Sequence, residues 1–318
     1  MEEKRFTAKM LWLFSHPKML CGKLFLKMDR NHWLNFLSDE LFIKLKWKVL
    51  KGYPLNLRNP QTFNEKLQWL KLYYHKKDFT TWVDKFAVKD YIAQKIGEEH
   101  VIPLLGVWDR PEDIDFSKLP DQFVLKCNHT SGIGLVICKD KSKLDTKKAI
   151  KELNRGLKDN YYKRNREWPY KDVKRKVFAE AYKVDESGRE LKDYKLYCFN
   201  GKPIFCQVDF GKEDGKNRSD FTRNIYDMDW NLQNVQYSHP NDPSRIIPKP
   251  MEFEKMKRLA HVLSKGEPFL RVDFYNVGHQ IYFSEITFYP IAALGRFVPQ
   301  DWDTQLGQLI QIPTITKK

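Results

Sequence analysis

Two short stretches near the C-terminus alternate strictly between apolar and polar residues, and a single turn separates them. The first reads LRVDFY from Leu270, the second reads IYFSEIT from Ile281, and Gly278 lies between them. Alternation with a period of two is typical of β-strands, and a short glycine-containing link between two such runs predicts a hairpin. A protein that contains this hairpin must build an antiparallel sheet around it.

The length of the turn decides which side chains of the hairpin share a face. A three-residue loop from Val277 to His279 is a common hairpin type, and it would set Arg271 opposite Glu285. Arg271, Asp273 and Glu285 would then point to the same side, whereas a four-residue loop would turn Glu285 to the other side. We expect the three-residue loop.

Two carboxylates and an arginine on one face of a sheet suit a divalent cation with nucleotide phosphates. Mg²⁺ takes hard oxygen ligands, usually one or two carboxylates together with phosphate oxygens, so Asp273 and Glu285 are candidate metal ligands. Arg271 is a candidate catalytic residue that stabilises the transferred phosphate. The alternative is a surface hairpin with a cross-strand Arg–Glu pair.

A second candidate element spans residues 123–134. An apolar strand reaches Lys126, a loop that contains Thr130, Ser131 and Gly132 follows, and an apolar run begins at Leu135. Such a loop can direct backbone N–H groups at phosphates, with the lysine as a point charge. The glycine spacings of Walker A and dinucleotide-binding loops are absent, and an ordinary hairpin around a glycine turn is the alternative.

A third element is the short apolar strand from Val177, which runs into Glu180, Ala181 and Tyr182. A carboxylate and a backbone carbonyl at the end of such a strand can bind the amino group of adenine. The alternative is a core strand that ends in an acidic residue.

In this order, the three elements resemble the ATP-grasp superfamily. Between about Phe63 and Asp303, three further motifs resemble the TupA-like ATP-grasp family: DYKLYCFNGKP from Asp193, YDMDWN from Tyr226 and EITFYP from Glu285. The resemblance implies that the nucleotide is bound by Lys85 (or Lys89), Lys126, Thr130, Ser131, Gly132, Glu180, Ala181, Tyr182 and Lys195. It also implies that Lys126 assists Arg271 in catalysis.

Two departures from the family pattern bear on activity. Thr287 stands where most ATP-grasp enzymes have an asparagine metal ligand, so the usual ligand for a second Mg²⁺ is missing. After Pro290 the sequence continues Ile291-Ala292-Ala293 in place of small, glycine-rich residues, which predicts a reshaped acceptor pocket or reduced activity.

The resemblance implies an α+β fold in which two lobes clasp ATP between antiparallel sheets. We expect a helical, basic region over residues 1–75, a lobe with the phosphate-binding hairpin over 76–176, and a lobe with the adenine hinge and metal site over 177–318. We also expect single helices over 79–96 and 251–265, a loop over 211–250 and a short C-terminal tail. Thr62 followed by Glu65 predicts a capped helix start.

The activity implied by the resemblance is an ATP- and Mg²⁺-dependent carboxylate–amine ligase that forms an acyl phosphate. Its setting would be teichuronopeptide, capsule or other bacterial surface-polysaccharide synthesis, with a small-molecule amine and an acidic sugar or lipid-linked glycan as partners. A glycosyltransferase and a non-catalytic nucleotide-binding partner are the alternatives. Asp227-Met228-Asp229 matches a glycosyltransferase DxD motif in letters, but no apolar strand leads into it.

The charge of the chain predicts an anionic ligand: 56 Lys and Arg against 41 Asp and Glu give a net charge of +15. The basic stretch 141–176 carries no nucleic-acid-binding signature, so we expect a solvated helix and no nucleic-acid partner. Five cysteines without a CxxC pair, and no signal peptide, favour a cytoplasmic location. The segment 11–37 suggests a peripheral contact with the inner face of the membrane, with an internal packing helix as the alternative.

Overall fold

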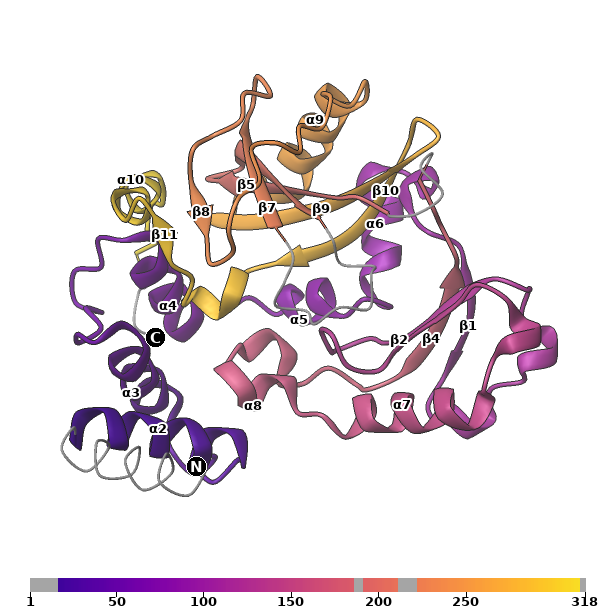
Figure 1. Ribbon diagram of the computed structural model, residues 1–318, viewed down its shortest axis with the longest axis horizontal. Coiled ribbons are helices and arrows are strands. Elements are labelled where there is room, and N and C mark those ends of the chain that lie inside the picture. The colour runs from indigo at the N-terminus through magenta and orange to yellow at the C-terminus, as the bar shows by residue number, and fades with distance from the viewer. Residues whose placement is uncertain (1–16, 186–190, 211–221, 315–318) are drawn as a thin grey trace, which may run out of the picture.

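Two antiparallel sheets organise the computed structural model, which describes residues 17–185, 191–210 and 222–314 (Figure 1). The four-stranded sheet has the order β1-β4-β2-β3, from β1 (Leu104–Trp108), β2 (Phe123–Cys127), β3 (Leu135–Cys138) and β4 (Val177–Ala181). The five-stranded sheet has the order β10-β9-β5-β6-β7, from β5 (Asp193–Phe199), β6 (Lys202–Phe210), β7 (Thr222–Asp227), β9 (Phe269–Val277) and β10 (Gln280–Thr287). Strands β8 (Gln236–Tyr237) and β11 (Phe297–Val298) form a separate short pair.

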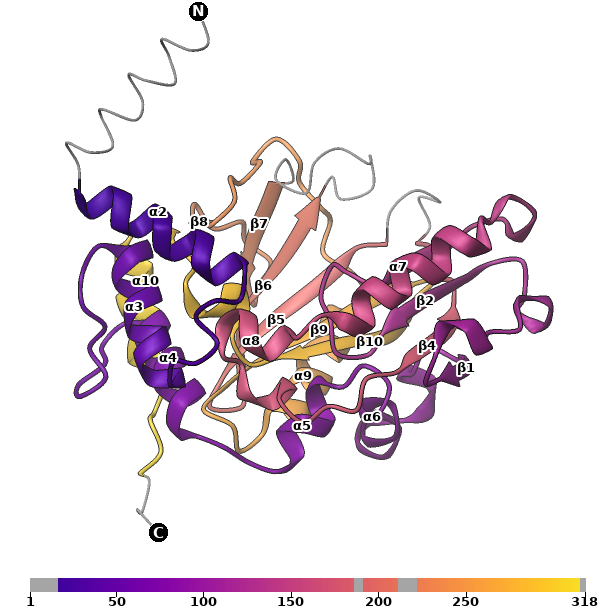
Figure 2. The same ribbon diagram turned by 90° about the horizontal axis from the view of Figure 1, so that it is seen from below.

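Helices cover the outer faces of the sheets, so the predicted α+β class is confirmed. The helix α9 lies on the five-stranded sheet, and α7 lies against β2 and β3 of the four-stranded sheet (Figures 1 and 2). The helices are α2 (Pro17–Arg30), α3 (Asp39–Lys51), α4 (Phe63–Tyr73), α5 (Asp78–Val83), α6 (Val88–Ile96), α7 (Thr146–Lys158), α8 (Tyr161–Asn165), α9 (Phe253–Ser264) and α10 (Asp301–Leu309). No helix within these described ranges is both long and apolar enough to cross a membrane.

Three separate groups of buried apolar residues form the core. The largest joins α4, α5 and α6 to the five-stranded sheet and to α9. A second lies between the four-stranded sheet and α7, and a third holds α2 and α3 together around Trp47. The division into residues 1–75, 76–176 and 177–318 stays a prediction; in the packing, α5 and α6 belong with the five-stranded sheet.

The hairpin of β9 and β10 differs from the expected register. The turn has two residues, Gly278 and His279, and both have positive φ (53° and 66°), as in the turn type that suits two-residue hairpins. The three-residue loop is therefore wrong. A bulge at Ser284 inserts one extra residue, so that Glu285 pairs with Asp273 and Thr287 pairs with Arg271. The bulge reverses the change of face that the shorter turn would cause, and the charged side chains still meet.

Three expectations about individual elements are wrong. Residues 79–96 form two helices, because Asp84 accepts hydrogen bonds from the backbone N–H groups of Phe86 and Ala87 and turns the chain. Of the stretch 211–250, expected as loop, residues 211–221 lie outside the described residues, and residues 222–227 form β7, which pairs with β6. The expected C-terminal tail contains the helix α10. The helix expected over 251–265 is confirmed as α9.

The capped start of α4 is confirmed and explains how the C-terminal helix is seated. The hydroxyl of Thr62 accepts from the Glu65 backbone N–H, and the Glu65 carboxylate accepts from the Thr62 backbone N–H. The helix α10 crosses at this point through Gly307, where an added Cβ would lie 2.1 Å from the carbonyl oxygen of Gln61. The absence of a side chain at Gly307 lets the two backbones touch.

We therefore expect Gly307→Ala to lower the free energy of unfolding by about 1–3 kcal/mol, because the added methyl overpacks a backbone contact. Gly22→Ala in α2 is the matched control, since its Cβ would meet Val49 at an ordinary 3.6 Å. There we expect a gain of about 0.5–1 kcal/mol from helix propensity. Urea unfolding measures the free energy of unfolding of both variants. Equal changes in the two would contradict the backbone contact at Gly307.

Candidate active site

A cavity of about 390 Å³ lies between the two sheets. The four-stranded sheet contributes Lys126, Phe178, Glu180 and the loop 130–134, and the segment before and within α6 contributes Lys85 and Lys89. The five-stranded sheet contributes Asp193, Lys195, Asp209, Arg223, Arg271, Tyr275 and Glu285. Polar residues that lie as far apart in the sequence as Lys85 and Glu285 thereby line the same cavity.

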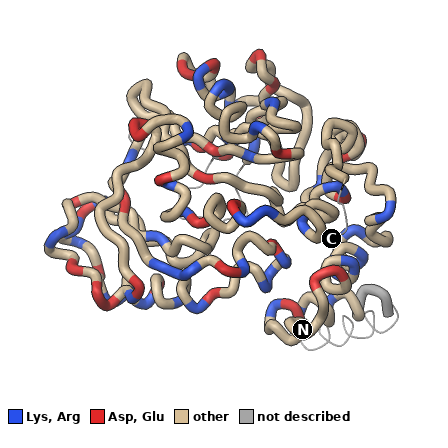
Figure 3. The backbone as a smooth tube through the Cα atoms, turned by 180° about the vertical axis from the view of Figure 1, so that it is seen from behind, with Lys and Arg blue, Asp and Glu red and all other residues tan. Residues whose placement is uncertain are grey.

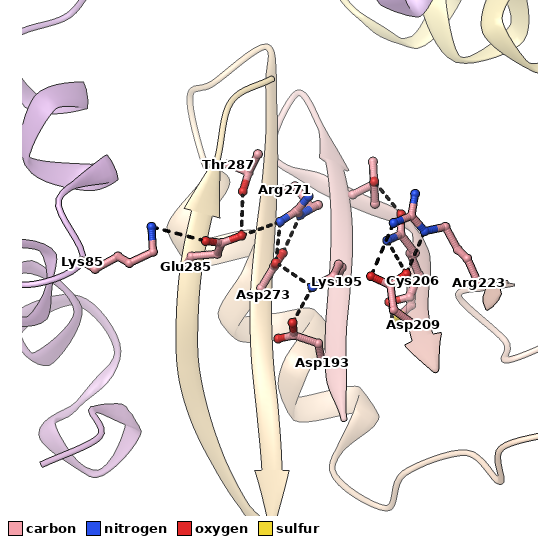
Figure 4. Close-up of polar contacts among 12 residues, drawn as sticks. Lys85, Asp193, Lys195, Cys206, Asp209, Arg223, Arg271, Asp273, Glu285 and Thr287 are labelled. Carbon is pink, nitrogen blue, oxygen red and sulfur yellow. Dashed lines mark hydrogen bonds and ion pairs between the residues drawn. The ribbon is translucent and has the colours of Figure 1, made fainter. Parts of the chain in front are cut away.

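Charged side chains on neighbouring strands form the floor of this cavity (Figure 4). Arg271 donates from Nε to Asp273 Oδ1 at 2.7 Å and from Nη2 to Asp273 Oδ2 at 2.6 Å. The same Nη2 lies 2.7 Å from Glu285 Oε1. Lys195 on β5 lies 3.3 Å from Asp273 Oδ2 and 2.5 Å from Asp193 Oδ2. Asp273, the centre of this network, is fully buried.

Burial and neighbouring charge act in opposite directions on these groups. Burial alone would raise the pKa of Glu285, but Lys85, Arg271 and Lys195 outweigh it and lower the pKa to about 2. Burial raises the pKa of Asp273 against the pull of Arg271 and Lys195. Burial opposes the charge of both cations, but Asp193 and Asp273 raise the pKa of Lys195 and Asp273 raises the pKa of Arg271. The floor therefore consists of charges that stabilise one another.

Lys85 approaches the floor from the other side of the cavity. Its Nζ lies 3.7 Å from Glu285 Oε2, and its backbone N–H donates to the carbonyl of Asn128, directly after β2. The Asn128 side chain in turn donates to Asp84 at 2.8 Å and to the carbonyl of Lys174. Hydrogen bonds thus join the segment 84–85, which precedes α6, to Asn128 at the start of the 128–134 loop.

A second ionic cluster lies on the four-stranded sheet, away from the floor. Lys126 and Lys89 both contact the carboxylate of Glu180, Lys126 at Oε1 and Lys89 at Oε2 with a distance of 3.1 Å. Burial alone would raise the pKa of Glu180, but these two lysines outweigh it and lower the pKa. Lys89 lies four residues after Lys85 and contacts Glu180, whereas Lys85 contacts Glu285.

The loop between β2 and β3 is held against α7 by close packing. The backbone N–H of Gly134 donates to Glu152 Oε1 at 2.9 Å. A Cβ at Gly134 would lie 2.9 Å from the Cα of Gly156 and 2.5 Å from the Cys127 sulfur, so glycine is required at this contact. The Thr130 hydroxyl donates to the Ile133 carbonyl inside the loop at 2.6 Å.

The residues after β10 adopt an unusual backbone. Ile291, Ala292 and Ala293 all have φ between 51° and 58°, a region in which each L residue costs about 1–2 kcal/mol. Gln68 and Lys71 of α4 hold this turn by donating to the carbonyls of Ala292 and Ala293. The departure at 291–293 therefore has its own supporting contacts, and its effect on an acceptor pocket stays a prediction.

Three of the predicted site residues do not line this cavity. Ala181 and Tyr182 follow Glu180 at the end of β4, and Asp273 is fully buried and contacts the lining residues Arg271 and Lys195. The hydroxyl of Thr287 donates to Glu285 Oε1 at 3.3 Å. Sequence reasoning missed Asp209 and Arg223, which form an ion pair at 2.7 Å on β6 and β7. Arg223 was hidden because its strand was expected to be loop. The roles assigned to the predicted residues stay predictions.

The carboxylates of Asp273 and Glu285 fit a divalent cation. One oxygen of each accepts from the single atom Arg271 Nη2, so a position within contact distance of both carboxylates already exists. Among the described residues there is no cluster of three or more His, Cys, Asp or Glu side chains that would bind a metal alone. Two carboxylates completed by phosphate oxygens is the arrangement that Mg²⁺ prefers.

The profile of the TupA-like ATPgrasp family matches residues 65–311. The chain belongs to this family. ATP-grasp enzymes use ATP, and the match spans every residue that lines the cavity. No curated protein matches the chain.

Solved ATP-grasp structures resemble the chain only distantly. D-alanine–D-alanine ligase from Bacillus anthracis shares 16% identity over 65% of this chain and 57% of its own, with a TM-score of 0.40. The same enzyme from Helicobacter pylori shares 12% over 79% and 67%, with a TM-score of 0.42. D-cycloserine synthetase DcsG shares 14% over 65% and 62%, with a TM-score of 0.37. The chain spans just over half the length of the Bacillus anthracis ligase.

His129 in the 128–134 loop provides a pH test of this site. Burial lowers the pKa of His129 to about 4, and its Nε2 contacts the carbonyl of Asp159 at 3.1 Å. The unfolded chain takes up this proton near pH 6.5, so the folded state loses stability as the pH falls from about 6.5 to about 4.

We expect His129→Gln to lose less unfolding free energy than the wild type between about pH 7 and about pH 4.5, as measured by urea unfolding. The exposed His32→Asn is the control, and it should follow the wild type because His32 lies in solvent. Parallel pH profiles for the wild type and His129→Gln would mean that His129 is not held neutral.

Lys89 and Lys85 can be separated by ATP affinity in this TupA-like protein. Because Lys89 contacts Glu180 in the cavity, we expect Lys89→Met to weaken ATP binding about tenfold or more, the effect of losing a charged hydrogen bond. Lys95→Met, an exposed lysine on the same helix, should bind ATP as the wild type does. Titration calorimetry measures the ATP affinity of each variant. Equal affinities of Lys89→Met and Lys95→Met would leave Lys85 as the nucleotide-binding lysine of this segment.

Proposed function

We propose that this protein is an ATP-dependent carboxylate–amine ligase of bacterial surface-polysaccharide synthesis. The observation that carries the proposal is the cavity between the two sheets, with an Arg271–Asp273–Glu285 network on one side and a Lys89–Lys126–Glu180 cluster on the other. The two groups are the kind of sites that phosphates with Mg²⁺ and an adenine base require.

In this proposal, Glu180 holds the adenine end of ATP, and Lys126 together with Lys85 or Lys89 holds the phosphates. The loop around Ser131 and Gly132 covers the phosphates, with backbone N–H groups as donors. Lys85 and Lys195 balance the phosphate charge from opposite sides of the cavity. Asp273 and Glu285 would hold Mg²⁺, which supplies Lewis-acid stabilisation of the phosphates when it is bound.

The proposed reaction has two steps. A carboxylate oxygen of the donor attacks the γ-phosphorus of ATP, the bond to the β–γ bridging oxygen breaks, and ADP leaves. The amine then attacks the acyl phosphate, an amide forms, and phosphate leaves with the proton balance completed by solvent. Arg271 contributes by stabilising negative charge on the transferring phosphoryl group, and its buried, paired position keeps it charged and oriented.

The family resemblance and the charge of the chain support the proposed substrates. A uronic acid supplies a carboxylate to be activated, and an amino acid or peptide supplies the amine, as in teichuronopeptide or capsule synthesis. The basic composition of the chain, a net +15, favours an acidic glycan as the donor. In the described part of the backbone, Lys and Arg are interleaved with Asp and Glu rather than gathered in one block (Figure 3).

A glycosyltransferase is less well supported. Its metal site would need Asp227 and Asp229, but the Asp227 carboxylate accepts hydrogen bonds from the backbone N–H groups of Asp229 and Asn231 and from the Asn231 side chain. That carboxylate caps a turn, and neither residue lines the cavity.

The test is ADP release from ATP and Mg²⁺ with candidate uronic acids and amino acids. The ligase predicts ADP that rises only when both an acid and an amine are present. Turnover of UDP-sugars without ATP would support a transferase, and nucleotide binding without turnover would support a non-catalytic partner. Mass spectrometry of the product identifies the amide.

Asp273→Asn should lower the turnover number by about 100-fold to 1,000-fold, because the metal-holding charge is lost while the side-chain shape remains. Glu254→Gln is the matched control, an exposed carboxylate on α9 that pairs with Lys249 at 2.9 Å and should leave turnover unchanged. Full activity of Asp273→Asn with unchanged circular dichroism would refute the metal assignment.

A further inference from the structure

An apolar surface with a basic border lies on the N-terminal helices. It consists of Leu24 on α2 with Trp33 and Phe36 in the connection to α3, which are 55%, 61% and 79% exposed, and we call it the N-terminal apolar surface. In both ribbon views α2 lies at the outer edge of the molecule, apart from both sheets (Figures 1 and 2). These side chains are therefore open to a large partner.

The exposed aromatic residues sit on an ordered backbone. The connection between α2 and α3 is a series of hydrogen-bonded turns, with the N–H of Trp33 donating to the Met28 carbonyl at 2.9 Å and that of Leu37 donating to the Leu34 carbonyl. The neighbouring apolar residues Leu34, Phe42 and Trp47 fill the core of the helix pair. The ordered backbone holds the side chains of Trp33 and Phe36 in solvent, and neither belongs to the apolar core of the helix pair.

The charge beside this surface is positive. Lys23, Lys27 and Arg30 are exposed on the same helix as Leu24. Between residues 17 and 37 the single acidic residue is Asp29, and its carboxylate is already paired with Lys46 at 2.8 Å. Exposed Trp and Phe beside lysine and arginine is the composition that binds the interface of an anionic bilayer.

We propose that the N-terminal apolar surface binds an anionic membrane, with Trp33, Phe36 and Leu24 in the interfacial layer and Lys23, Lys27 and Arg30 against the lipid phosphates. A second copy of the chain is a poorer occupant. It would bring the same basic residues face to face and would add no opposite charge.

The helix pair is fastened to the segment 162–166, which lies in and directly after α8. The Tyr162 hydroxyl donates to the Asp39 carboxylate at 2.7 Å, Arg166 donates to the Leu34 carbonyl at 3.0 Å, and Lys46 donates to the Asn165 side chain. Further along the same segment, the pKa of Tyr170 is raised by burial and by nearby groups that include Glu285. A bilayer bound at α2 would therefore lie at a fixed distance from the cavity, as a membrane-borne acceptor requires.

The experiment is sedimentation of the full chain with sucrose-loaded vesicles of phosphatidylcholine alone or with one quarter phosphatidylglycerol. We expect binding to the anionic vesicles only, and binding that falls as salt is added. Trp33→Ser with Phe36→Ser should abolish it. Lys23→Ala with Lys27→Ala should weaken vesicle binding roughly 30-fold, because two lysines that are attracted to the anionic surface are lost.

The matched control is Ile246→Ser with Met251→Ser, which removes two other apolar side chains that are 73% and 82% exposed but lie far along the chain from α2. It should bind vesicles as the wild type does, and all variants should keep the wild-type affinity for ATP. Equal vesicle binding by the Trp33/Phe36 variant and the wild type would overturn the proposal. So would a chain that ignores vesicles but forms a dimer in light scattering that the Trp33/Phe36 variant loses.

Discussion

The buried contact between Arg271 and Asp273 is the interaction on which the rest of the site depends. A fully buried carboxylate is costly unless cations pair with it, and Asp273 has both Arg271 and Lys195. This arrangement requires β5, β9 and β10 to be adjacent, in the one register that brings the three strands' charges together. The floor of the cavity is therefore fixed by the same pairing that forms the sheet.

The opposite wall is held to this floor by a different kind of contact. Lys85 reaches Glu285 from a chain segment whose backbone is bonded to Asn128, and Asn128 starts the loop that packs through Gly134 on α7. The two sheets therefore meet at a few short polar contacts around the cavity rather than through a shared apolar core.

The sequence could predict the two strands of the site hairpin and the capped helix start at Thr62, because each depends on local periodicity or on a short motif. The grouping of Arg271, Asp273 and Glu285 was predicted from a three-residue loop, whereas the structure reaches it through a two-residue turn and a bulge. The sequence could not predict the bulge at Ser284, since a bulge changes the register without changing the alternation on either side of it. Arg223 was missed because the polar composition of 211–250 indicates loop, whereas its strand β7 is stabilised by pairing with the preceding strand β6.

We propose that Asp273 and Glu285 share one divalent cation beside the phosphates. Diffraction from crystals grown with Mn²⁺ and a non-hydrolysable ATP analogue, collected for the anomalous signal of manganese, tests it directly. We expect a manganese peak in contact with both carboxylates and with phosphate oxygens, with Arg271 displaced from Glu285 toward the γ-phosphate. A nucleotide bound elsewhere, or a cavity in which Arg271 still bridges both carboxylates and no manganese is present, would contradict it.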